Sequence, residues 1–194
     1  RIGTNNLQAG IKAAEAALAT DDEELYIGIA NYDVNSAKGQ QRELGFRQTV
    51  EQDPRVKNIT TINVLSTTED ARAGAKEMLL SDSRINVVVT FNEWTSLGVG
   101  WAIRDLNRAD RIQVVAFDSN VVSVGMLETG EVDALIVQNP YAMGYLGVET
   151  AANLMNGQTG GPSVVDTATT IVTRENMYEP ESQKILFSFE EEGY

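Results

Sequence analysis

Short apolar runs alternate along the chain with longer stretches in which apolar residues recur every three or four positions. The run INVVVT at 85–90 is the most strand-like, because it is almost uninterrupted and rich in β-branched residues. Asn5 and Asn6 are predicted to precede the first helix, in which Leu7 and Ile11 share one face. Strands are predicted at 25–30, 59–65, 85–90, 112–117 and 133–137, with a final extended stretch over 164–172. Helices are predicted at 7–18, 37–52, 70–80, 95–107, 121–129 and from Pro140 to about 155.

This alternation is typical of βαβ units. It predicts an α/β fold in which a parallel sheet carries helices on both faces, as a Rossmann-like three-layer sandwich. The nearly continuous apolar runs agree with that prediction, because strands covered on both faces bury every side chain. The last residues, 179–194, show no clear pattern and are predicted to form a C-terminal tail.

Composition excludes several classes of function. The 194 residues carry a formal net charge of −13, which argues against binding nucleic acid directly and against an anionic membrane surface. The chain has no cysteine and no histidine, so disulfides, Cys/His zinc sites, thiol nucleophiles and His-dependent triads are excluded. No metal site and no cofactor is expected, and no apolar run is long enough to span a membrane.

Polar residues follow every predicted strand, at the edge of a parallel sheet where ligands bind. Amides, hydroxyls and carboxylates suit a sugar or polyol, whose hydroxyls both donate and accept hydrogen bonds. Aromatic side chains would cover the C–H surface of a sugar ring. The alternative is that these residues cap the next helix, although glutamine is not a favoured cap. The residues concerned are Asn31, Tyr32, Asp33, Ser66, Thr67, Thr68, Glu69, Phe91, Asn92, Glu93, Trp94, Asp118, Ser119, Asn120, Gln138 and Asn139.

Signatures of catalysis are missing from these turns. The sequence has no GxSxG elbow and no Walker loop, and Gly98 and Gly100 fall inside a predicted helix rather than a phosphate-binding turn. Glu69, Asp70 and Glu93 are suited to acid–base chemistry, but acids at helix starts usually interact with the helix dipole. We therefore expect no enzyme and no catalytic residues.

Five segments, in order and at similar spacing, resemble one family over roughly residues 3–178. The segments are GTNNLQAG (3–10), SAKGQQRELGF (36–46), VVVTFNEWTSLG (87–98), VVAFDSN (114–120) and ALIVQNPYAMGYLGVETA (134–151). The family that they resemble comprises bacterial sugar-binding proteins of the ribose-binding type, which share their fold with the effector domains of lactose-repressor-type regulators.

The resemblance implies two α/β lobes that close on a sugar, with four matching ligand-binding residues in this chain. An aromatic residue that the family often has near Glu69 is absent, and Trp94 is expected to compensate for it. The implied ligand-binding residues are Arg42, Asn92, Asp118 and Gln138, with Trp94 and Glu69 as further candidates.

The resemblance also implies a division of the chain. Residues 3–138 would form the C-terminal lobe, and 139–178 would supply a crossover, helix and strand to an N-terminal lobe that is mostly missing. The chain does not begin with Met, which agrees with a missing upstream part. Without that lobe an apolar patch would be exposed, and we expect the fragment either to form homodimers through it or to repack the helix that carries it. The patch residues are Leu146, Val148, Ala151 and Leu154.

The function implied by the resemblance is that of an extracytoplasmic solute-binding protein, periplasmic or at the cell surface, which serves the permease of an ABC-type sugar importer. The first alternative is the effector domain of a lactose-repressor-type transcriptional regulator. The second alternative, from a different class, is an α/β enzyme that acts on a polar metabolite.

Overall fold

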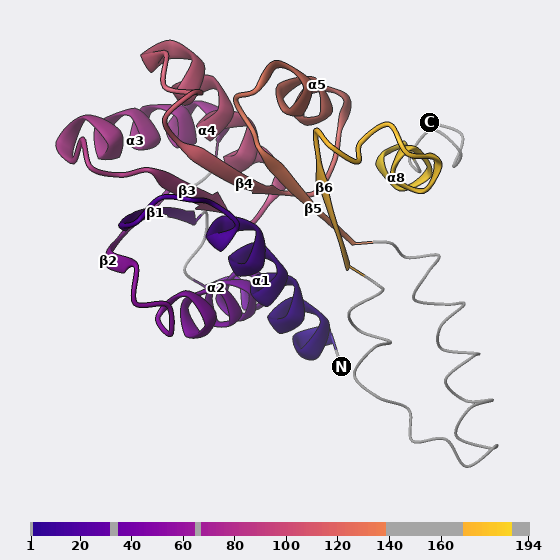
Figure 1. The fold of residues 1–194 in the computed structure, drawn as a ribbon, viewed down its shortest axis with the longest axis horizontal. Coiled ribbons are helices and arrows are strands. Elements are labelled where there is room, and N and C mark those ends of the chain that lie inside the picture. Colours follow the sequence, from indigo (N-terminus) through magenta and orange to yellow (C-terminus); the bar gives the residue numbers. More distant parts are fainter. Residues whose placement is uncertain (1, 32–34, 65–66, 139–168, 188–194) are drawn as a thin grey trace.

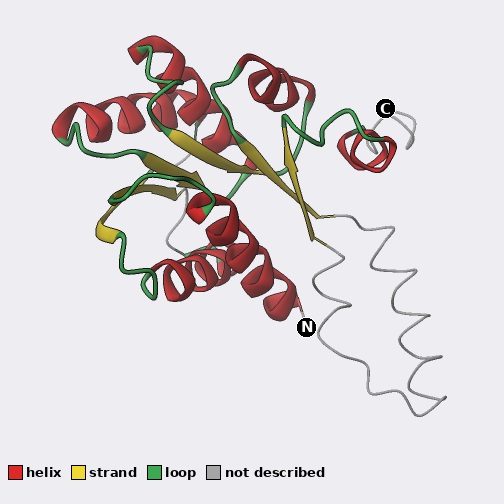
Figure 2. Cartoon of the chain, viewed as in Figure 1, coloured by secondary structure: helices red, strands yellow, loops and turns green. Residues whose placement is uncertain are grey.

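A computed structural model describes residues 2–31, 35–64, 67–138 and 169–187. Six strands form one sheet in the order β2-β1-β3-β4-β5-β6, and all are parallel except β6, which runs antiparallel to β5 (Figures 1 and 2). The strands are β1 (Leu25–Asn31), β2 (Val56–Asn63), β3 (Val87–Thr90), β4 (Gln113–Phe117), β5 (Ala134–Gln138) and β6 (Thr169–Thr173). The helices are α1 (Ile2–Leu18), α2 (Ala37–Val50), α3 (Thr68–Ser81), α4 (Glu93–Leu106), α5 (Val121–Thr129) and α8 (Pro180–Leu186).

The helices cover both faces of the sheet, so the predicted three-layer α/β fold is confirmed (Figure 1). α1 and α2 pack on one face, where Val87 and Val115 point. α3, α4, α5 and α8 pack on the other face, where Val88 and Val114 point. Neighbouring strand residues thus enter opposite cores, which explains why the central strands are apolar throughout.

β6 and α8 correct the expected division of the chain. Residues 169–173 were expected in the other lobe, but they pair with β5 from Ala134↔Thr173 to Gln138↔Thr169. α8 replaces the expected patternless start of the tail, and it buries Leu186 against the core of α3, α4 and α5. A strand pattern says that a segment is extended, but not which sheet it joins. The helix predicted after Pro140 and its apolar patch lie outside the described residues.

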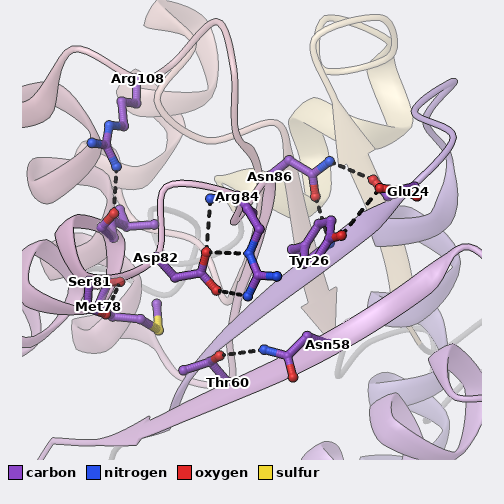
Figure 3. A network of polar contacts seen from close by, with 11 residues as sticks. Glu24, Tyr26, Asn58, Thr60, Met78, Ser81, Asp82, Arg84, Asn86 and Arg108 are labelled. Carbon is purple, nitrogen blue, oxygen red and sulfur yellow. Dashed lines mark hydrogen bonds and ion pairs between the residues drawn. The ribbon is translucent and has the colours of Figure 1, made fainter.

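A polar network joins the starts of β1 and β3 at the amino-terminal edge of the sheet (Figure 3). Asn86 donates its backbone N–H to Tyr26 O, and its side-chain oxygen accepts from Tyr26 N at 2.9 Å. Its amide nitrogen also donates to Glu24 O. Arg84 lies 4.6 Å from the Tyr26 ring centroid and pairs with both oxygens of Asp82. The backbone and side chain of Asn86 therefore extend the pairing of β1 with β3 by one residue.

α1 and α2 touch through two glycines. A Cβ on Gly10 would collide with the carbonyl oxygen of Arg42, and one on Gly45 would collide with the carbonyl oxygen of Leu7. The two backbones are therefore in direct contact at this crossing, with no room for a side chain at either glycine. In the part of the chain that the structure describes, no helix is long and apolar enough to cross a membrane.

The crossing predicts opposite effects of two Gly→Ala changes. Gly45→Ala should lower the free energy of unfolding by about 1–3 kcal/mol, because α1 must move away from α2. Gly125→Ala is the matched control: a Cβ there meets nothing within 4 Å, and the change should stabilise α5 by about 0.5–1 kcal/mol. Urea unfolding followed by circular dichroism measures both. Equal effects of the two changes would show that the helices do not touch at Gly45.

Candidate ligand-binding site

Strand order places a switch point between β1 and β3, since β1 pairs with β2 on one side and β3 on the other. In open α/β sheets ligands bind at such a point, outside the carboxyl ends of the strands. Asn92, Asp118 and Gln138 come from the ends of β3, β4 and β5, while Arg42 comes from α2, which follows β1. The structure thus brings these four predicted residues to one edge of the sheet.

Arg42 joins three separate parts of this edge. Its side chain is buried, with 5% exposed. Nε donates to Asn6 Oδ1 at 3.0 Å, Nη1 donates to Phe91 O at 2.5 Å, and Nη2 donates to Gln138 Oε1 at 3.3 Å. The acceptors lie in α1, after β3 and at the end of β5, so the guanidinium plane is fixed from three directions. All three acceptors are uncharged.

A row of buried aromatic rings packs against Arg42. Its guanidinium carbon lies 4.6 Å from the Phe117 ring centroid, within the range of a cation–π interaction. Phe117 and Phe91 lie edge to face with centroids 5.8 Å apart, and Phe91 and Phe46 repeat that arrangement. Phe91 is completely buried, so it belongs to the core and cannot cover a sugar ring, contrary to expectation.

Asn92 caps the helix that follows β3. Its Oδ1 accepts from Thr95 N at 3.0 Å and caps α4, as the capping alternative predicted. Within the described part of the chain the Asn92 amide nitrogen donates no hydrogen bond, so its N–H groups suit a ligand oxygen. α5 is capped by Asn120 rather than by Asp118, which leaves the Asp118 carboxylate outside any cap.

Asp118 occupies a strained and desolvated position. Its φ of 63° lies in the left-handed region, which is uncommon for a residue other than glycine. Burial raises the pKa of the Asp118 carboxyl, and the nearby positive charge of Arg42 opposes this rise. The carboxylate and the guanidinium therefore act on each other at the same edge of the sheet. Strain combined with a perturbed pKa is typical of functional positions.

Trp94 and Glu69, the other two candidate ligand-binding residues, lie at the periphery of the site. Trp94 is partly buried in the first turn of α4, two residues after Asn92. Glu69 is exposed in the first turn of α3. In the same helix the hydrogen bond to Asp105 raises the pKa of Arg72, and the charge of Glu69 adds a smaller contribution. α3 follows β2, which β1 separates from β3, so Glu69 belongs to a different part of the edge. Tyr32 lies outside the described residues.

Sequence reasoning missed two residues that hold this site together. Asn6 lies inside α1 rather than before it, and it binds Arg42. Ser96 is buried in α4; its hydroxyl donates to Asn92 O at 2.6 Å and accepts from Phe117 N at 3.2 Å. The segment GTNN carried a signal for Asn6, but the sequence contains no local signal for Ser96, because its partners lie in different strands and turns.

The opposite edge of the sheet is a poorer site. A hollow of about 420 Å³ there includes Asp133, Arg174 and Gln113 in its lining. Asp133 already pairs with Arg174 at 2.7 Å and accepts from Val114 N, so its charge serves the fold. Among the described residues, no group of three or more carboxylates is placed to hold a metal ion.

Comparison with known proteins shows the family. A family described as periplasmic binding protein domain matches residues 1–159. The chain belongs to this family. A curated relative, the D-ribose/D-allose-binding protein of Pseudomonas aeruginosa, is 27% identical over 150 residues, which cover 76% of this chain and 47% of the relative. The resemblance to ribose-type binding proteins is thereby confirmed.

Solved structures show the same likeness. A carbohydrate transporter solute-binding protein from Agrobacterium radiobacter, in complex with D-arabinose, aligns with a TM-score of 0.74 at 26% identity, covering 93% of this chain and 63% of that one. The periplasmic component of an ABC-type sugar transport system from Hahella chejuensis aligns at 0.68 with 30% identity, covering 87% and 62%. The chain thus spans about half the length of the curated relative and under two thirds of these structures.

Asp118→Asn should raise the melting temperature at pH 7. Because the folded-state pKa is raised, the contribution of Asp118 to stability is fully present below its unfolded pKa of about 3.9 and is lost as pH rises through the folded pKa. Asparagine stays neutral and tolerates the left-handed backbone. The melting temperature of variant and wild type, measured by calorimetry from pH 7 to pH 3.5, should converge as pH falls. A lower melting temperature of the variant at pH 7 would contradict this.

Proposed function

We propose that this chain forms one lobe of the extracytoplasmic solute-binding component of an ABC-type sugar importer, and that it binds a monosaccharide or related polyol. The observation that carries the proposal is the meeting of Arg42, Asn92, Asp118 and Gln138 at the carboxyl edge of the sheet. A carboxylate, a guanidinium and two amides offer donors and acceptors in the mixture that sugar hydroxyls require.

The relatives support the same class of ligand. The curated relative is named a D-ribose/D-allose-binding protein, the Agrobacterium radiobacter transporter protein holds D-arabinose, and the Hahella chejuensis protein is named as the periplasmic component of an ABC-type sugar transport system. We infer a permease partner and a location outside the cytoplasm from this similarity. Trp94 is proposed to cover the apolar face of the sugar, since it lies in the turn that Asn92 begins. Glu69 remains a candidate to bind a sugar hydroxyl at the periphery of the site.

The proposed mechanism is closure of a second lobe over the sugar. Hydrogen bonds from both lobes would make the closed state bind more tightly than the open one, so the ligand would shift the population toward closure. In this scheme the buried, fixed guanidinium of Arg42 offers a pre-organised surface, and little ordering is needed on this side when the sugar arrives.

Loss of either charged residue should weaken binding in the complete protein. Arg42→Ala and Asp118→Ala should each cost about 2–4 kcal/mol of binding free energy, because each leaves a desolvated partner unpaired. Titration calorimetry with D-ribose, D-allose, D-arabinose, D-fucose and D-tagatose measures the change. Arg111→Ala, an exposed arginine at the opposite edge, is the matched control and should bind as the wild type does. A loss of less than about threefold at both sites would place the site elsewhere.

The 194-residue chain without a second lobe should bind these sugars weakly or undetectably. Its ligand would keep one exposed side and lose the bridging contacts that favour closure. Titration calorimetry on this chain and on the complete protein compares the two directly. Micromolar affinity of the chain alone would show that this lobe suffices for binding.

A further inference from the structure

Asn6 is a buried polar residue that lies in a helix rather than in a turn after a strand. It lies in α1 with 4% of its surface exposed, and its Oδ1 accepts the hydrogen bond from Arg42 Nε at 3.0 Å. Asparagine is a weaker helix former than alanine or leucine, because its side chain competes for the backbone. Its presence in a buried helical turn is explained by the partner that it meets on α2.

Asn6 reaches Arg42 only because α1 and α2 are in backbone contact. The side chain of asparagine is short, so it bridges two helices only where they approach closely. That approach is set by Gly10, which faces the carbonyl of Arg42 itself, and by Gly45, which faces the carbonyl of Leu7. The Asn6–Arg42 hydrogen bond therefore depends on the close contact of α1 and α2 at Gly10 and Gly45.

The bond at Nε controls the plane of the guanidinium. Nη1 and Nη2 donate to Phe91 O and Gln138 Oε1, and the face of the group lies over Phe117. Without the oxygen of Asn6, a buried N–H would lack its acceptor, and the group would gain by rotating toward another one. Such a rotation would move both terminal nitrogens, which lie at the edge shared with Asp118.

We propose that Asn6 is a positioning residue for ligand binding: from α1, its side-chain oxygen holds the Arg42 guanidinium in the orientation in which it meets the ligand. Asn6 acts through Arg42 and does not itself need to touch the ligand. The link to a sugar rests on the proposed function, whereas the control of Arg42 by Asn6 stands on the geometry of α1 and α2.

The rate at which the Arg42 Nε proton exchanges with solvent tests the positioning role in the absence of any ligand. In the 15N-labelled chain, this resonance is assigned by its loss in Arg42→Lys. Asn6→Leu removes the acceptor and should speed exchange about tenfold or more, as expected when one buried hydrogen bond is lost. Asn6→Asp keeps an oxygen and should retain slow exchange. Asn5→Leu changes the neighbouring asparagine in the same helix and should leave the rate unchanged. Fast exchange in the wild type would overturn the proposal.

Sugar binding by the complete protein tests the consequence. With D-ribose and D-arabinose as probes, Asn6→Leu should weaken binding about tenfold, and Asn6→Asp should restore most of the affinity. In an Arg42→Lys background, Asn6→Leu should have less than about a twofold further effect, because lysine has no Nε donor to hold. Equal losses in both backgrounds would mean a general structural role and would overturn the proposal.

The two measurements separate this proposal from the function on which it rests. If the wild-type complete protein bound neither sugar, the proposed function would fail for these ligands, and the exchange rates would still decide whether Asn6 holds Arg42. If the wild type bound sugar but Asn6→Leu bound it equally well, the function would stand and the positioning role would be refuted.

Discussion

The buried guanidinium of Arg42 is the constraint on which this edge of the molecule depends. Burial of a charge is costly unless polar groups surround it, and here three uncharged oxygens and an aromatic face do so. Each acceptor comes from a different element, so the hydrogen bonds hold α1, the end of β3 and the end of β5 at fixed distances from α2. The same contacts orient a group that is suited to bind a sugar hydroxyl.

The turns beside Arg42 are joined by side chains where the sheet ends. The pairing of β3 with β4 stops at Val89↔Val115, and the hydroxyl of Ser96 then accepts from Phe117 N and donates to Asn92 O. Asp118 follows directly with a left-handed backbone. Local strain and desolvation at Asp118 reduce stability, and the surrounding hydrogen bonds keep that residue in place. The opposite edge of the sheet differs in this respect, because charged groups there, such as Asp133 and Arg174, form ion pairs with each other.

Much of the fold and four members of the candidate site could be predicted, for a physical reason. Apolar runs and helical periodicity are local properties, and they set the strands and helices. Parallel strands point their carboxyl ends the same way, so residues such as Asn92 and Gln138 must share one edge. Features that depend on which surfaces meet were not predictable: β6 pairs with β5, α8 packs against the core of α3, α4 and α5, and the Phe91 side chain is buried in the core.

The sequence by itself determined an α/β sheet with a polar carboxyl edge, because the periodicity of apolar residues and the ends of the strands depend only on residues that are close together in the chain. Only the tertiary structure decided how that edge is held. Asn6 and Arg42 are separated by 36 residues, and they meet because Gly10 and Gly45 let two helices touch. Contacts of this kind arise from the packing of distant segments, and no local pattern encodes them.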